Sequence, residues 1–106
     1  MRSMLCASGL LALAACYAPV VAAETIRISV DKLAFAPAQV SAHVGDTIEW
    51  TNKDFIAHTA TARDKEWDVA LPVKGGGSVT LKSAGEVEYY CRFHPNMKGR
   101  ISVSAP

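Results

Sequence analysis

From residue 24 onward, the chain alternates hydrophobic and polar residues with a period of two. The alternation occurs in six short stretches, around residues 26–30, 40–44, 48–50, 79–81, 87–91 and 101–103. A period of two places successive side chains on opposite faces of a β-strand. No stretch repeats hydrophobic residues at helical spacing for three turns. The pattern therefore predicts several short, half-buried strands, one of which turns Val87, Tyr89 and Cys91 inward.

Proline, glycine and small polar residues separate these stretches. Pro37 interrupts the chain after the first strand because it lacks a backbone N–H donor. Turns are predicted at 45–46, at the three glycines 75–77 and at 83–85, and a further short strand is expected at 58–61. Short strands at this spacing are typical of an all-β sandwich or barrel in a single domain.

Residues 1–23 have the pattern of a secretory signal peptide. Arg2 precedes an apolar run, and small residues end the segment at Ala23. The run is too short and wrongly flanked for a membrane-spanning helix. Cleavage after Ala23 would leave a folded domain at 24–106.

Two of the three cysteines, Cys6 and Cys16, lie in this leader, which leaves Cys91 as the thiol of the domain. Residues 13–16 also resemble a bacterial lipobox, so a second possibility is that Cys16 carries a lipid anchor. An exported protein would normally pair its cysteines in disulfides. An unpaired cysteine is either a free reactive thiol or a metal ligand.

The charges argue against a nucleic-acid partner. Arg2 is the one charged residue of the leader, so of the 11 basic and 10 acidic residues in the chain, ten of each remain from residue 24 on. They are interspersed, with no basic stripe or acidic tail.

Three potential metal ligands, a thiol, an imidazole and a thioether, lie close together in a Cys-x2-His-x2-Met motif formed by Cys91, His94 and Met97. Soft sulfur ligands with imidazole suit copper, and two histidines, a cysteine and a weak axial methionine form a blue-copper site. The second histidine must be His43 or His58. His43 falls on the polar face of its stretch, whereas His58 begins a predicted strand after a loop, so His58 is the expected fourth ligand.

Each of these residues also has an ordinary structural role open to it. Cys91 could be a small buried side chain, Met97 could fill a gap in the core, and His94 could be a surface residue. Zinc is the rival metal, but structural zinc sites use more cysteines and no methionine. A catalytic cysteine is a second rival, although no third group is evident that would orient His94.

The stretch Val44–Asn52, together with His58 and the motif around Cys91, resembles the plastocyanin and azurin group of cupredoxins. The short ligand loop is most like that of amicyanin. The resemblance covers about residues 25–103. It implies a Greek-key β-sandwich with one type 1 copper per chain, and one-electron transfer in the periplasm. Thr59 stands where the family usually has Asn, and Phe93 stands where amicyanin has Pro.

This interpretation predicts an electron carrier and not an enzyme, because four protein ligands leave no open position for a substrate. We expect a monomer whose transient redox partners dock around His94, with no nucleic-acid partner and no transmembrane helix. The apolar loop residues that could surround His94 are Phe35, Ala36, Pro37, Phe55, Ile56, Phe93 and Pro95. A periplasmic copper protein for storage, delivery or tolerance would use the same ligands and is the alternative function.

Overall fold

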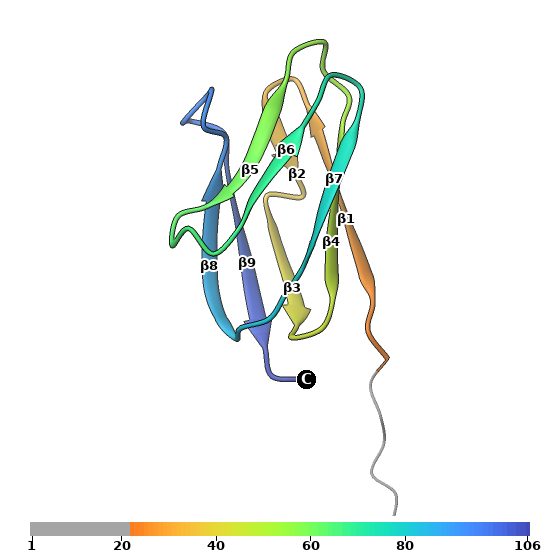
Figure 1. The fold of residues 1–106 in the computed structure, drawn as a ribbon, viewed down its shortest axis with the longest axis vertical. Coiled ribbons are helices and arrows are strands. Elements are labelled where there is room, and N and C mark those ends of the chain that lie inside the picture. The colour runs from red at the N-terminus through yellow and green to blue at the C-terminus, as the bar shows by residue number, and fades with distance from the viewer. Residues whose placement is uncertain (1–21) are drawn as a thin grey trace, which may run out of the picture.

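The computed structural model describes residues 22–106, and within them nine strands form two sheets (Figure 1). Most of the predicted signal peptide, including Cys6 and Cys16, lies outside the described residues. The strands are β1 (Thr25–Asp31), β2 (Ala34–Ala36), β3 (Gln39–His43), β4 (Thr47–Asn52), β5 (His58–Ala62), β6 (Asp68–Leu71), β7 (Gly76–Thr80), β8 (Gly85–Tyr90) and β9 (Lys98–Ser104).

The two sheets are mixed and lie face to face as a sandwich. One has the strand order β2-β1-β4-β7 and the other the order β3-β9-β8-β5-β6. Most neighbours are antiparallel, but β1 pairs with β4, and β3 with β9, in parallel. The prediction of an all-β sandwich is confirmed. No helix in the described part of the chain is long and apolar enough to cross a membrane.

An aromatic cluster fills the core between the sheets. Trp50 and Tyr89 are fully buried, and their ring centroids lie 5.4 Å apart. Phe35 packs edge-on against Tyr89. Trp67, whose place the sequence did not indicate, lies half-buried with its ring 5.5 Å from that of Trp50. The alternation predicted for 87–91 is confirmed, since Val87, Tyr89 and Cys91 are all buried.

Two of the three glycines predicted to form a turn lie in a strand instead. Gly76 and Gly77 are the first residues of β7, which pairs with β4. A Cβ at Gly76 would lie 2.7 Å from the Trp50 carbonyl oxygen, and one at Gly77 would lie 2.5 Å from Val69 Cγ1. Glycine is needed at these two positions because the neighbouring strands leave no room for a side chain. Glycine inside a strand often marks such a close approach.

Four connections meet at one end of the sandwich, at the top of Figure 1. They are the β1–β2 turn, the β4–β5 loop, the β6–β7 loop and the loop after β8. Because β1 and β4 are parallel, both strands deliver their following loops to this end. This convergence places the histidine that begins β5 beside the cysteine that follows β8.

Candidate metal centre

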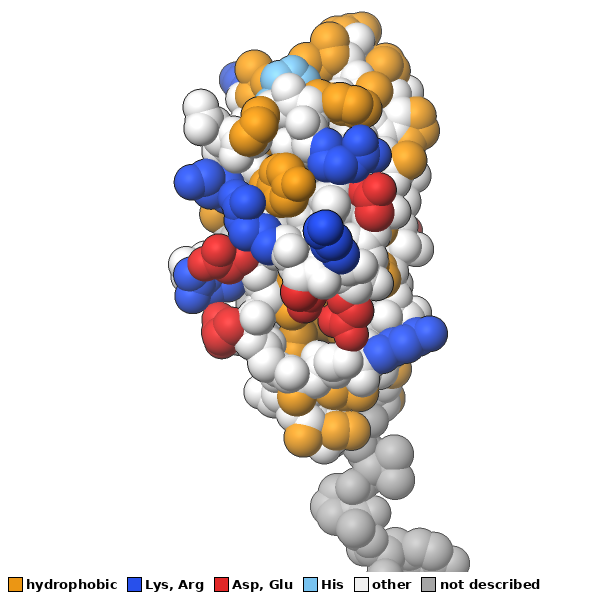
Figure 2. Space-filling view, turned by 60° about the vertical axis from the view of Figure 1, so that its left-hand side comes forward, with side chains coloured by type: hydrophobic (Ala, Val, Ile, Leu, Met, Phe, Trp, Pro, Cys, Tyr) orange, Lys and Arg blue, Asp and Glu red, His pale blue; other side chains and the backbone are white. Residues whose placement is uncertain are grey.

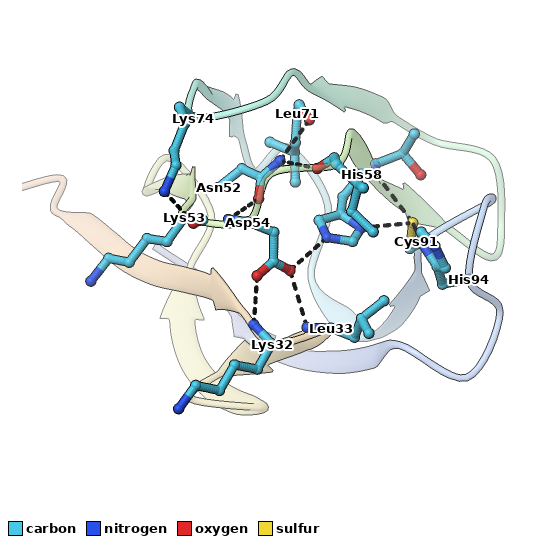
Figure 3. Close-up of polar contacts among 12 residues, drawn as sticks. Lys32, Leu33, Asn52, Lys53, Asp54, His58, Leu71, Lys74, Cys91 and His94 are labelled. Atoms are coloured by element: carbon cyan, nitrogen blue, oxygen red, sulfur yellow. Dashed lines mark hydrogen bonds and ion pairs between the residues drawn. The ribbon is translucent and has the colours of Figure 1, made fainter.

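The structure brings His58, Cys91 and His94 together at this end of the sandwich (Figure 3). Cys91 Sγ lies 3.7 Å from Nδ1 of His58 and 3.6 Å from Nδ1 of His94. Cys91 and His58 are buried, at 0% and 1% exposure, while His94 is half-buried. Three donor atoms therefore lie close together, and His94 is the most exposed of the three residues.

These separations fit one metal ion. Bond lengths of about 2.0 Å to imidazole nitrogen and about 2.3 Å to thiolate sulfur, at a trigonal angle of about 120°, separate nitrogen and sulfur by about 3.7 Å. The observed distances of 3.6 and 3.7 Å match this value. All three donor atoms lie within 4.8 Å of one another. The cluster can hold a first-row metal without rearranging its side chains.

Asp54 fixes which nitrogen of His58 faces the cluster. Its Oδ2 lies 2.8 Å from Nε2 of His58 (Figure 3). A carboxylate accepts a hydrogen bond, so Nε2 carries the proton and donates it to Asp54. The lone pair is then on Nδ1, the nitrogen near Cys91. A carboxylate behind a metal-binding imidazole also orients the ring and makes it more basic.

Asp54 is itself held by the β1–β2 turn. The backbone N–H groups of Lys32 and Leu33 donate to its carboxylate, at 2.7 and 3.1 Å. The hydrogen bond from Leu33, followed by that from the His58 ring, lowers the pKa of Asp54 from 3.8 to about 2. Asp54 was not among the predicted site residues. An acidic residue four positions before an expected ligand histidine was the available signal.

The loop after β8 is closed by its own backbone. Cys91 N donates to Met97 O, His94 N donates to Cys91 O, and Met97 N donates to His94 O. The loop therefore returns to Cys91, and the Met97 side chain is buried at 3% exposure. Met97, the fourth expected ligand, is therefore buried, and its backbone carbonyl is hydrogen-bonded to the backbone N–H of Cys91.

Thr59 connects the strand of His58 to the loop of Cys91. Its backbone N–H donates to Cys91 Sγ at 3.4 Å, and its Oγ1 accepts from the backbone N–H of Arg92 at 2.9 Å. Threonine therefore joins the two ligand segments at the position where the resembled family usually has Asn.

His43 lies at the end of β3 and away from the cluster. Its side chain is 52% exposed, and its ring lies 3.8 Å from the carboxylate of Asp46. The expectation that His43 is solvated is confirmed, and His58 is the histidine that meets Cys91.

Comparisons with known proteins place the chain in a family. A model of the cupredoxin-like domain matches residues 4–103. Amicyanin of Paracoccus denitrificans is 29% identical over 91 residues, 78% of this chain and 68% of that protein. Amicyanin-alpha of Methylorubrum extorquens (strain AM1) is 28% identical over 87 residues, 76% of this chain and 73% of that protein.

The fold is also similar to solved structures. The reduced Cu(I) form, at pH 4, of a proline-to-glycine mutant of amicyanin is 28% identical with a TM-score of 0.65, and the match covers 79% of this chain and 86% of that one. The family model spans nearly the whole sequence, so this protein belongs to the cupredoxin-like domain family.

Proposed function

We propose that this protein carries single electrons on one type 1 copper ion held by His58, Cys91, His94 and Met97. The observation that carries the proposal is the buried Cys91 sulfur, 3.6 and 3.7 Å from two imidazole nitrogens. The loop that contains Met97 closes over it. Methionine favours copper over zinc at such a site. The similarity to a Cu(I) form of amicyanin supports the same metal.

A carrier needs a site that changes little between its two oxidation states. Copper, when bound, supplies the one-electron change between Cu(II) and Cu(I). Cys91 follows directly on the strand β8, and β5 begins at His58. Asp54 holds the His58 ring, and three backbone hydrogen bonds hold the loop of His94 and Met97. The protein therefore keeps one ligand geometry, and the four side chains leave no position for a substrate. We assign it no enzymatic reaction.

The surface around His94 suits brief contacts with other redox proteins. Large hydrophobic side chains that are exposed in the described chain all lie in the four connections at this end (Figure 2, top). They are Leu33, Phe55, Ile56, Val73 and Phe93, and Phe55 is 81% exposed. Gathered apolar side chains mark an interaction surface. Small contacts suit transient electron-transfer partners.

Phe35 was expected at this surface but is not exposed. Phe35 is 4% exposed and packs in the core against Tyr89. Leu33, two residues earlier, is 49% exposed and lines the same hollow as Phe93 and His94. The β1–β2 turn therefore contributes Leu33 to the docking surface in place of Phe35.

We place the protein in the periplasm as a monomer, released after Ala23 or anchored through Cys16. The first of these forms begins with Glu24, and the second begins with a lipidated Cys16. Mass spectrometry of the mature protein decides between them, because the two chains differ by the residues 16–23 and a lipid.

The copper assignment is tested by Cys91→Ala. The thiolate gives a blue-copper site its intense colour, whereas the packed strands carry the fold. We expect the purified variant to be folded and colourless after copper loading, while the wild type is blue and cycles reversibly between two oxidation states. A blue Cys91→Ala protein would contradict the ligand assignment. A blue wild type that cycles slowly and releases Cu(I) readily to a chelator would favour storage or delivery instead.

A further inference from the structure

Strand β5 carries two buried hydroxyl groups close to the candidate metal ligands. Thr59 and Thr61 are two residues apart and share one face of the strand, at 2% and 7% exposure. Their Oγ1 atoms are 2.9 Å apart. Buried hydroxyl groups need hydrogen-bond partners. One partner lies at each end of the pair, the Arg92 backbone N–H beside Thr59 and the Asp68 carboxylate beside Thr61.

Arg92 N–H, Thr59, Thr61 and Asp68 form a chain of hydrogen bonds. The direction of each bond in it follows from the groups at its two ends. Asp68 Oδ1 accepts from Thr61 Oγ1 at 2.6 Å, because an ionised carboxylate cannot donate. Thr61 donates its only hydroxyl proton to Asp68, so its Oγ1 must accept the hydrogen bond from the hydroxyl of Thr59. Thr59 in turn accepts from the Arg92 N–H. The bonds run head to tail from the peptide that follows Cys91 to a carboxylate on β6.

Such a chain acts as a unit. Each bond polarises the next, and the terminal anion strengthens the whole series. The hydrogen bond from Thr61, and after it the Arg92 guanidinium, hold the pKa of Asp68 below its usual value. The side chain of Arg92 also closes the ring, with Nε 3.3 Å from Asp68 Oδ1.

The side chain and the backbone of Thr59 both affect the position of the Cys91 sulfur. Its hydroxyl holds the peptide between Cys91 and Arg92, and its own backbone N–H points at Sγ at 3.4 Å. We infer that Asp68 is a positioning residue for the metal centre and acts through Thr61 and Thr59 on the orientation and hydrogen bonding of the Cys91 sulfur. An ordinary surface ion pair between Asp68 and Arg92 would have no such effect and little influence on stability.

Thr61→Val tests the chain because valine keeps the shape of threonine and removes the hydroxyl. In metal-free protein, we expect amide hydrogen exchange at Arg92 to be about fivefold to tenfold faster, as for the loss of one hydrogen bond. In the copper-loaded protein, the blue absorption band should shift. Thr61→Ser keeps the hydroxyl and should restore both the exchange rate and the band.

Asp68→Asn tests the carboxylate itself, and Glu88→Gln is its matched control. Glu88 is an exposed carboxylate on β8 that pairs with Arg100 and has no contact with the chain of hydroxyl groups. Both variants lose one negative charge, so Glu88→Gln controls for the loss of a charge at the surface. Faster exchange at Arg92 and a shifted blue band should occur in Asp68→Asn and not in Glu88→Gln.

The inference rests on the proposed copper site, but its failure can be told apart from a failure of that site. A wild type that never turns blue counts against the copper assignment, while amide exchange in metal-free protein still tests the hydrogen-bond chain. If Thr61→Val and Asp68→Asn both keep the wild-type exchange rate at Arg92, Asp68 does not position the centre. If Thr61→Val does not fold, Asp68→Asn alone decides, because its side chain is half-exposed.

Discussion

At the scale of single residues, the tightest fit near the site is between Tyr89 and Gly99. The two residues are directly opposite on β8 and β9, and the Tyr89 ring covers Gly99. A Cβ on Gly99 would lie 2.3 Å from Cζ of Tyr89. The ring has no space to withdraw, since its hydroxyl accepts a hydrogen bond from Trp50. Burial raises the pKa of Tyr89 to about 12.

We predict that Gly99→Ala destabilises the fold, because the added methyl group must displace a packed aromatic ring. Overpacking of this kind costs about 1–3 kcal/mol. In a domain of this size, each kcal/mol lowers the melting temperature by about 4–8 °C. Thermal unfolding of the metal-free protein measures the effect. Ser104→Ala, at the exposed end of the same strand, should change stability by less than about 0.5 kcal/mol. A wild-type melting temperature for Gly99→Ala would show that Tyr89 can move aside.

Sequence reasoning at this scale identified residues whose chemistry is unusual for their surroundings. A cysteine, a histidine and a methionine in one short loop indicated a metal site, and the structure brings Cys91, His94 and His58 together. It failed for Gly99 and Asp54, whose importance depends on contacts with Tyr89 and with the β1–β2 turn. The contact between Gly99 and Tyr89 leaves no pattern in the neighbouring residues, whereas the place of Asp54 four residues before His58 was a signal that could have been used.

At the scale of elements, the β4–β5 loop is built around Asp54. The loop begins from Asn52, whose side-chain oxygen accepts from the Asp54 backbone N–H and whose amide donates to the carbonyl oxygens of Ile56, Leu71 and Pro72. Asp54 then accepts from the β1–β2 turn and from His58. The Asn52 amide and the Asp54 carboxylate thus link the β1–β2, β4–β5 and β6–β7 connections and hold the His58 ring in place.

We predict that Asp54→Ala weakens metal binding about 10–100-fold, the usual effect of removing a carboxylate behind a ligand histidine. The variant loses both the orientation of the His58 ring and the preference for a proton on Nε2. Competition with a chelator of known affinity measures the change. Asp31→Ala removes an exposed carboxylate at the same end of the sandwich and should bind metal as the wild type does. Equal affinities for the two variants would contradict the role given to Asp54.

Most strand positions followed from the alternation, but β2 and β6 were not predicted and β7 begins earlier than expected. β2 and β7 show why. The short strand β2 contains Phe35 between two alanines and directly precedes Pro37, so its pattern is too brief to distinguish from a break. β7 begins with two glycines that composition alone assigns to a turn. In both cases the partner strand decides the structure, because β1 and β4 supply the pairing that local sequence does not predict.

At the scale of the whole molecule, the two ends of the sandwich have different tasks. The proposed copper site and the exposed apolar residues occupy one end. At the other end, the start of the described domain is anchored to the β3–β4 turn. Thr47 N donates to Glu24 O, and Glu24 N lies 2.9 Å from Oδ1 of Asp46. Asp46 is buried at 4% exposure and also accepts from the backbone N–H of His43.

This anchor gives the proposed cleavage after Ala23 a physical consequence. Cleavage there would turn Glu24 N into a charged α-amino group placed on a buried carboxylate. The hydrogen bond from Glu24 N, and after it that from His43 N, already hold the pKa of Asp46 below its ordinary value of 3.8. A lowered carboxylate pKa means that the stabilisation is present above pH 3.8 and is lost as the pH falls below it.

We therefore predict that the protein beginning at Glu24 melts at a higher temperature than the same protein beginning at Ala22, in which the charge lies two residues away. The advantage should be full between about pH 4 and pH 7 and should shrink above about pH 8, where an α-amino group loses its proton. Added salt should reduce it. Asp46→Asn should lower the melting temperature of both forms and remove the difference between them. Equal melting temperatures of the two wild-type forms at pH 6 would show that the amino group does not dock on Asp46.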